Sequence, residues 1–183
     1  MDLIFSHDDA RNTTLSSSSG QPLYEISTPG SREQTTITKL HPGEKPTEIG
    51  CVELRSGDAS VCQVSGRDVL PRTGEFGRKN LAWSFTSSNG EKYTWTRKWD
   101  SNLLFDLTDT SKTSVVVYER SHSGFFSGKP RPAKLTLLPE GVALGILDEI
   151  VVTFVYIGQK AQQFRRAALI ASGAATGASG FGW

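Results

Sequence analysis

The segment LDEIVVTFVYIGQKAQQFRR, residues 147–166, constrains the fold more than any other part of the chain. From Ile150 to Ile157 both faces of an extended strand would be apolar, so alternation does not identify a strand there. The apolar run between Glu149 and Gln159 is less than half of the ~20 residues that a helix needs to span a bilayer. We therefore expect neither a half-exposed strand nor a membrane span.

The same segment has the spacing and the composition of a helix. No proline interrupts it, and QKAQQFRRAAL consists mostly of good helix formers. Acids at Asp148 and Glu149 suit the start of a helix, and Arg165 and Arg166 suit its C-terminal half. The residues at helical intervals are Leu147, Ile150, Val151, Phe154, Ile157, Ala161, Phe164 and Ala168. We predict a helix over 147–171 whose first half, apolar all round, must be enclosed by other elements.

The first two-thirds of the chain has the pattern of β structure. Short runs rich in Val, Ile, Thr and aromatic residues alternate with turn signals such as TPGS, HPGEKP and RSGD. The clearest hairpin is SFTSSNGEKYTW, in which Asn89-Gly90 suits a tight turn. Ten such runs at close spacing are typical of a barrel or a sandwich.

One enclosed helix and ten or more strands together predict a mainly β fold. We expect a closed antiparallel β-barrel of about ten to twelve strands around a buried C-terminal hydrophobic helix. Residues 1–171 would form this single domain, with the helix at 147–171. The glycine-rich residues 172–183 are expected to be a flexible tail.

Composition limits the partners and the compartment. Lys plus Arg number 20 and Asp plus Glu 19, so net charge offers no general attraction to nucleic acid. The first residues, MDLIFSHDDA, lack the basic and apolar regions of a signal peptide. Cys51 and Cys62 make neither a disulfide framework nor a zinc site, although a hairpin at RSGDA would bring them across from each other. We expect two reduced thiols in a cytoplasmic, monomeric protein.

Several motifs occur in a fixed order: LPRTGEFGR (70–78), FTSSNGEKYTW (85–95), FFSGKPRPAKL (125–135), PEG (139–141) and LDEIVVTFVYI (147–157). In these motifs the chain resembles an uncharacterised domain family of mushroom-forming fungi, over about residues 1–166. That family is similar in layout to tubby-like and LURP-one-related barrels and to phospholipid scramblases. The resemblance implies a tubby-like barrel with a central helix. It implies no activity, because the chain has neither an EF-hand loop nor a recognisable tubby lipid-site motif.

Motifs for catalysis are mostly missing from the sequence. There is no G-x-S-x-G or H-E-x-x-H, and GFFSGKP (124–130) lacks the spacing of a P-loop. The histidines His7, His41 and His122 lie in separate turn-like segments, so we expect no metal and no cofactor. Asp148 and Glu149 would suit a general acid–base pair, but the favourable charge of acids at a helix start is the preferred explanation.

Local positive charge is the remaining functional signal. Arg67 and Arg72 accompany one long connection, and a second group of cations surrounds SHSGFFSGKPRP (121–132). Basic groups beside aromatic side chains suit an anionic membrane surface. The alternative is a solvated rim with the Phe side chains packed inward. The candidate lipid- or anion-binding residues are Arg78, Lys79, Arg120, Lys129, Arg131 and Lys134, and the candidate membrane contacts are Phe125 and Phe126.

The sequence therefore favours a non-enzymatic cytoplasmic binding module that is peripheral at membranes and recognises anionic phospholipid headgroups. Two other classes stay open. One is a scaffold or defence-related component that binds an unidentified protein. The other is a hydrolase with a carboxylate site at the mouth of the barrel.

Overall fold

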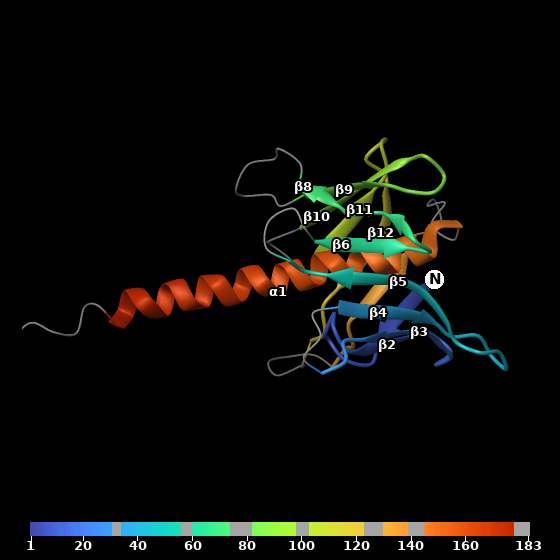
Figure 1. Cartoon of the computed structure of the whole chain (residues 1–183), viewed down its shortest axis with the longest axis horizontal. Helices are drawn as coiled ribbons and strands as arrows, with labels where there is room; N and C mark the ends of the chain where they lie inside the picture. Colours follow the sequence, from blue (N-terminus) through green and yellow to red (C-terminus); the bar gives the residue numbers. More distant parts are fainter. Residues whose placement is uncertain are drawn as a thin grey trace, which may run out of the picture.

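A computed structural model describes residues 1–30, 34–55, 60–73, 82–97, 103–122, 130–138 and 145–177. Within these ranges the chain forms thirteen strands and one long helix (Figure 1). The strands are β1 (Asp2–Phe5), β2 (Thr13–Ser17), β3 (Pro22–Ser27), β4 (Gln34–Lys39), β5 (Thr47–Glu53), β6 (Val61–Val64), β7 (Arg67–Asp68), β8 (Arg72–Thr73), β9 (Ala82–Thr86), β10 (Lys92–Arg97), β11 (Leu103–Thr108), β12 (Ser114–Glu119) and β13 (Lys134–Leu137). The helix is α1 (Leu147–Gly177).

All described strands belong to one antiparallel sheet, in the order β7-β6-β5-β4-β3-β2-β1-β13-β12-β11-β10-β9-β8. Neighbours in this order are neighbours in the chain, except that β1 pairs with β13. Alternate residues point inward, as in β10, where Tyr93 and Trp95 are buried and Thr94 and Thr96 are partly exposed. The sheet is therefore an up-and-down meander whose first and last strands lie side by side.

The sheet does not close into a barrel, so the expectation of a closed barrel of ten to twelve strands is wrong. Its described edges, β7 and β8, have two residues each and share no ladder. Only residues 69–71 separate them in the chain, and Pro71 has no N–H to donate. The chain thus crosses the opening as a short connection, where a closed barrel would need two paired strands.

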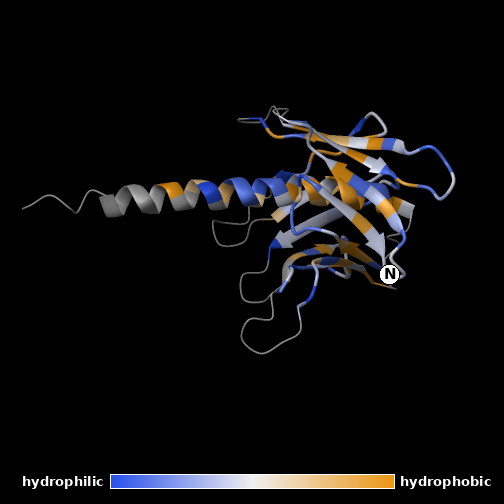
Figure 2. Ribbon diagram, turned by 90° about the horizontal axis from the view of Figure 1, so that it is seen from below, coloured by the Kyte–Doolittle hydropathy of each residue, from blue (hydrophilic) through white to orange (hydrophobic). Residues whose placement is uncertain are grey.

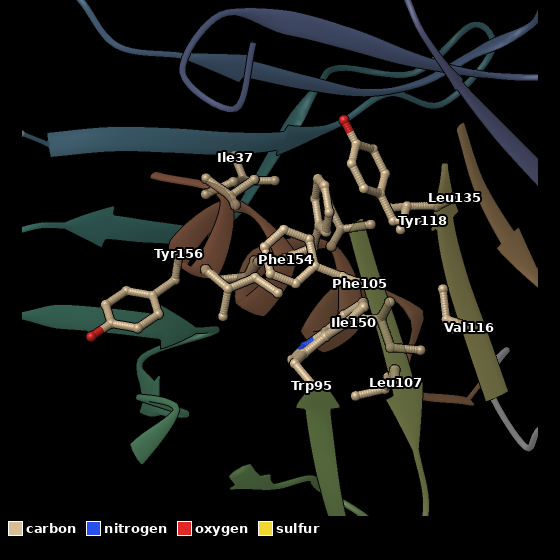
Figure 3. Close-up of a cluster of buried hydrophobic side chains, with 14 of the residues drawn as sticks. Ile37, Trp95, Phe105, Leu107, Val116, Tyr118, Leu135, Ile150, Phe154 and Tyr156 are labelled. Atoms are coloured by element: carbon tan, nitrogen blue, oxygen red, sulfur yellow. The ribbon is translucent and has the colours of Figure 1, made fainter. Parts of the chain in front are cut away.

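The predicted helix is present, and its first half is buried. Every residue from Glu149 to Ile157 is buried, and Phe154 packs against aromatic rings of four strands. The ring centroid of Phe154 lies 5.5 Å from Phe5, 5.9 Å from Trp95, 6.2 Å from Phe105 and 4.6 Å from Tyr118 (Figure 3). The helix also packs against β5 and β6. The open sheet therefore curls around α1.

Two glycines allow other parts of the chain to approach α1 closely. A Cβ atom on Gly50 of β5 would lie 2.4 Å from the carbonyl oxygen of Gln63 and 2.9 Å from Cγ2 of Val152. A Cβ atom on Gly158 would lie 2.9 Å from the Cβ of Ala10. Any side chain at these positions would push the sheet or the loop away from the helix.

The polar atoms in the buried stretch have partners. Trp95 Nε1 donates to Thr153 Oγ1 at 3.1 Å, and Thr153 Oγ1 donates to the carbonyl of Glu149 at 2.7 Å. Further along, Gln159 Nε2 donates to Thr35 Oγ1 at 2.8 Å. These bonds remove the penalty of burying unpaired polar groups and fix the rotation of α1 inside the sheet.

Beyond Ala161 the helix leaves the sheet and projects from it (Figures 1 and 2). It continues to Gly177, so it is longer than the helix predicted over 147–171. Residues 178–183 of the expected tail lie outside the described residues. The projecting segment, residues 162–177, therefore makes up just over half of α1.

Cys51 and Cys62 are free, as predicted. They lie on the paired strands β5 and β6, but Cys51 is opposite Gln63 and Val52 is opposite Cys62. This offset of one residue places the two thiols on opposite faces of the sheet. Burial raises the pKa of the Cys62 thiol, so it stays protonated.

We expect Phe154→Ala to lower the free energy of unfolding by ~3–5 kcal/mol, because it leaves a cavity among four aromatic rings. Chemical denaturation measures this value. Gln163→Ala is the matched control on the exposed part of the same helix and should change the value by less than ~0.5 kcal/mol. Equal stability of the two variants would show that Phe154 is not enclosed.

Candidate functional site

A pocket of about 680 Å³ opens beside the first turn of α1. It lies between that turn and strands from one half of the sheet. We call it the helix-start pocket. Charged and polar side chains from β3, β4, β7 and α1 converge on it, namely Tyr24, Lys39, Arg67, Asp148 and Glu149.

Asp148 holds one side of the helix-start pocket. Its carboxylate accepts a hydrogen bond from the Tyr24 hydroxyl at 2.7 Å and from Lys39 Nζ at 2.9 and 3.2 Å. Lys39 Nζ also lies 5.9 Å from the centre of the Tyr24 ring. Burial and the bond to Asp148 raise the pKa of Tyr24, so its hydroxyl remains a donor.

Glu149 holds the other side and bridges the opening of the sheet. It is only 4% exposed, and both of its carboxylate oxygens accept from the backbone N–H of Ser88 at 3.0 Å. Arg67 Nη2 donates to the same carboxylate, while Arg67 Nη1 donates to the carbonyl of Thr86 at 3.1 Å. The side chains of Arg67 and Glu149 therefore connect β7 to the hairpin after β9, although no backbone hydrogen bonds of the sheet pair these two described elements.

This arrangement decides between two interpretations of Asp148 and Glu149. Both acids do lie at a helix start, but each also has a cationic partner on a strand. A general acid–base pair needs a carboxyl that is free to exchange its proton with a substrate. Here the carboxylate of each acid accepts two or more hydrogen bonds. The contacts therefore favour a role in positioning the cations Lys39 and Arg67. No group of three His, Cys, Asp or Glu side chains in the described part of the chain is placed to hold a metal ion.

Arg120 and Arg131, two of the predicted anion-binding residues, lie at the other end of the molecule, where α1 leaves the sheet. Arg120 borders a small pocket there together with Ala161 and Gln162. Arg131 is exposed, and its backbone exchanges two hydrogen bonds of 2.9 Å with that of His122. The structure thus places Arg120 beside the start of the projecting segment, and Arg131 at the same end of the sheet.

Carboxylates already neutralise two of the predicted cations. Arg120 Nε donates to Asp8 at 3.0 Å, and Lys134 Nζ lies 3.4 Å from Glu119 and 4.0 Å from Asp2. These pairs weaken the attraction of either cation for an anionic ligand. The other predicted residues, Arg78, Lys79, Phe125, Phe126 and Lys129, lie outside the described residues.

Asp8 organises this end of the molecule. Besides Arg120, it accepts hydrogen bonds from the Tyr118 hydroxyl at 2.6 Å and from Ser121 Oγ at 2.8 Å. Burial alone would raise the pKa of Asp8, but the hydrogen bonds from Tyr118, Ser121 and Arg120 outweigh it and lower the pKa. The carboxylate thereby ties the loop after β1 to the end of β12.

The projecting segment is a surface that the predicted site did not include. Phe164 is 49% exposed and Ile170 is 73% exposed, and Arg166 is also exposed. No Asp or Glu follows Glu149 in the sequence, whereas Lys160, Arg165 and Arg166 do. This charge asymmetry could be seen in the sequence. The exposure of Phe164 could not, because Phe164 has the same helical spacing as the buried residues Phe154 and Ile157. The described part of the chain holds no helix long and apolar enough to cross a membrane.

Asp8→Asn should lower the free energy of unfolding by about 1 kcal/mol at neutral pH, because three donors lose a charged acceptor. Folding lowers the pKa of Asp8, so its contribution is present above the ordinary value of 3.8 and is lost as the pH falls through the lowered value. Denaturation at several pH values should therefore show the difference from wild type shrinking in acid. Glu44→Gln, on an exposed turn, is the control. A difference that persists at the lowest pH would contradict the assigned role of the carboxylate.

Comparisons with known proteins place the chain in a family without assigning it an activity. No curated protein and no solved structure matches it. One family does match, over residues 8–163, which include most of the sheet and the buried half of α1. The predicted membership of an uncharacterised family is thereby confirmed: the chain belongs to the Family of unknown function (DUF6593).

Proposed function

We propose that this protein is a non-enzymatic binding module that attaches to anionic phospholipid surfaces by the end from which α1 projects. One observation carries the proposal. Of the three large apolar side chains that are exposed among the described residues, two, Phe164 and Ile170, lie on a projecting segment that has basic residues and no acid.

The chemistry of this segment suits an interface between water and lipid. Each cation close to an acidic lipid surface contributes ~1 kcal/mol. Insertion of Phe164 and Ile170 between the acyl chains would remove apolar area from water, at roughly 25 cal/mol per Å². A helix of this kind lies in the plane of the interface and does not cross it.

Neighbouring cations support the same orientation. Arg120 and Arg131 lie at this end of the sheet, although the pair with Asp8 reduces the contribution of Arg120. Arg78, Lys79, Lys129 and Lys134 remain candidate headgroup contacts, and Phe125 and Phe126 remain candidate membrane contacts. Cytoplasmic location, a monomeric state and fungal origin are also part of the proposal.

The similarity to tubby-like, LURP-one-related and scramblase folds is proposed in a modified form. An antiparallel sheet curled around an apolar C-terminal helix supports it, with an open edge in place of a closed barrel. This likeness concerns layout alone and adds no residue to the lipid-binding site.

A hydrolase has one observation in its favour, which is that Asp148 and Glu149 line a pocket. Both carboxylates, however, are bonded to cations and to further donors. A scaffold role would use the same exposed side chains as lipid binding, and the experiment below separates the two.

Flotation with vesicles tests the proposal. We expect the full chain to float with vesicles of equal amounts of phosphatidylcholine and phosphatidylserine. With vesicles of phosphatidylcholine alone, it should remain in the bottom fraction. Arg166→Glu should weaken binding about tenfold or more, because it replaces one favourable charge by an unfavourable one. The double variant Phe164→Ser, Ile170→Ser should abolish flotation, because it removes both of these exposed apolar side chains.

Lys92→Glu is the matched control, since Lys92 is exposed on β10, beside the hairpin that contacts Glu149 at the opposite end. It should float like wild type, and all variants should melt like wild type. Failure of wild type to float, even at low salt, would exclude lipid binding and favour the scaffold. Flotation that the projecting segment does not influence would place the lipid site elsewhere.

A further inference from the structure

We infer that the helix-start pocket binds a small organic anion, in which a carboxylate or a phosphate monoester is attached to an apolar body. This site is separate from the proposed lipid contact. Along α1, Glu149 and Gln162 are about 20 Å apart at 1.5 Å per residue. A headgroup of a membrane at the projecting end therefore does not reach the pocket, and its ligand must come from solution.

The size and lining of the helix-start pocket suit such a molecule. Its volume of about 680 Å³ lies within the range of small-molecule sites. Apolar side chains cover part of the wall, namely Leu23, Leu40, Val64 and Ile146. A ligand must therefore offer apolar surface as well as charge.

The hydrogen-bonding capacity that remains in the helix-start pocket is mainly that of donors. Both oxygens of Asp148 and of Glu149 already accept hydrogen bonds. Arg67 has five N–H donors, and its described contacts occupy Nη1 and Nη2 once each. The side chain of Arg67 is 40% exposed and that of Lys39 is 34% exposed, so both can meet a ligand. A ligand that satisfies these donors must be rich in acceptors.

The two cations are held in place before any ligand arrives. Asp148 and Glu149 are consecutive on α1, so their side chains point to different sides of its first turn. Asp148 draws Lys39 from β4, and Glu149 draws Arg67 from β7. An anion between them would gain two charged donors at little cost in side-chain ordering. The positive end of the α1 dipole adds to this attraction.

A purely structural role would explain Arg67 but not Lys39. Arg67 compensates the buried Glu149, and its removal would leave a buried charge without its partner. The pair of Lys39 and Asp148 is about one-third exposed on both sides, and such pairs contribute little to stability. Lys39→Met is therefore the variant that distinguishes ligand binding from support of the fold.

Calorimetric titration with 1-naphthyl phosphate and with 1-naphthoate tests the inference. We expect saturable binding of at least one of these anions, and at least tenfold weaker binding of both inorganic phosphate and neutral 1-naphthol. The phosphate arm reports the charge alone, and the naphthol arm reports the apolar body alone.

Three variants locate the site. Lys39→Met should weaken binding at least tenfold without lowering the melting temperature. Gly145→Trp should block the pocket, since Gly145 lines it and an added Cβ meets no atom within 4 Å. Arg11→Met should bind like wild type, because Arg11 follows Ala10, which packs against Gly158 at the other end of the enclosed helix.

The inference is wrong if neither naphthyl anion binds saturably, or if both Lys39→Met and Gly145→Trp bind like wild type. Vesicle flotation of Lys39→Met should match that of wild type. If the protein floats with vesicles but does not bind the naphthyl anions, the pocket proposal fails. If it binds the naphthyl anions but does not float, the lipid proposal fails.

Discussion

Enclosure of the apolar stretch from Ile150 to Ile157 is the constraint on which the rest of the structure depends. Every residue of this stretch is buried, so it has no face that could meet water. An isolated helix of this composition would expose its apolar surface on all sides. The sheet removes that surface from water by curling around it, and aromatic side chains from β1, β10, β11 and β12 meet at Phe154 (Figure 3). The core is therefore arranged around the helix.

Enclosure of only part of α1 makes its two ends chemically different. At the start, the carboxylates of Asp148 and Glu149 pair with cations from β4 and β7. At the other end, the projecting segment exposes Phe164 and Ile170 beside basic residues. Both proposed binding sites lie where α1 passes out of the apolar interior.

The helix could be predicted from the sequence because burial on all sides leaves a local signature. Its apolar run is too short for a membrane and too uniform for a half-exposed strand. Its C-terminal limit was less predictable, since the glycine- and alanine-rich residues after Ala171 resemble a tail, yet α1 continues to Gly177. Alanines that favour a helix and glycines that disfavour it alternate in this segment, so composition does not locate the end.

The openness of the sheet and the contacts of its charged residues could not be predicted in the same way. Closure depends on whether β7 and β8 pair, and two residues on either side of a short connection carry too little pattern to decide it. Lys39 and Asp148 are 109 positions apart, and Arg67 and Glu149 are 82 apart. Cations were recognised in the sequence, but Asp8 and Glu119 as the partners of Arg120 and Lys134 were not, because strand order decides which charges meet.

Hydrogen exchange of the α1 amides tests most directly whether the sheet encloses the helix. The enclosed amides from Ile150 to Ile157 should exchange only when the whole domain unfolds, with a free energy equal to that from chemical denaturation. Amides of the projecting segment should exchange through local opening, at far lower free energy. Equal and weak protection of both halves would contradict the enclosure of the helix and the architecture built on it.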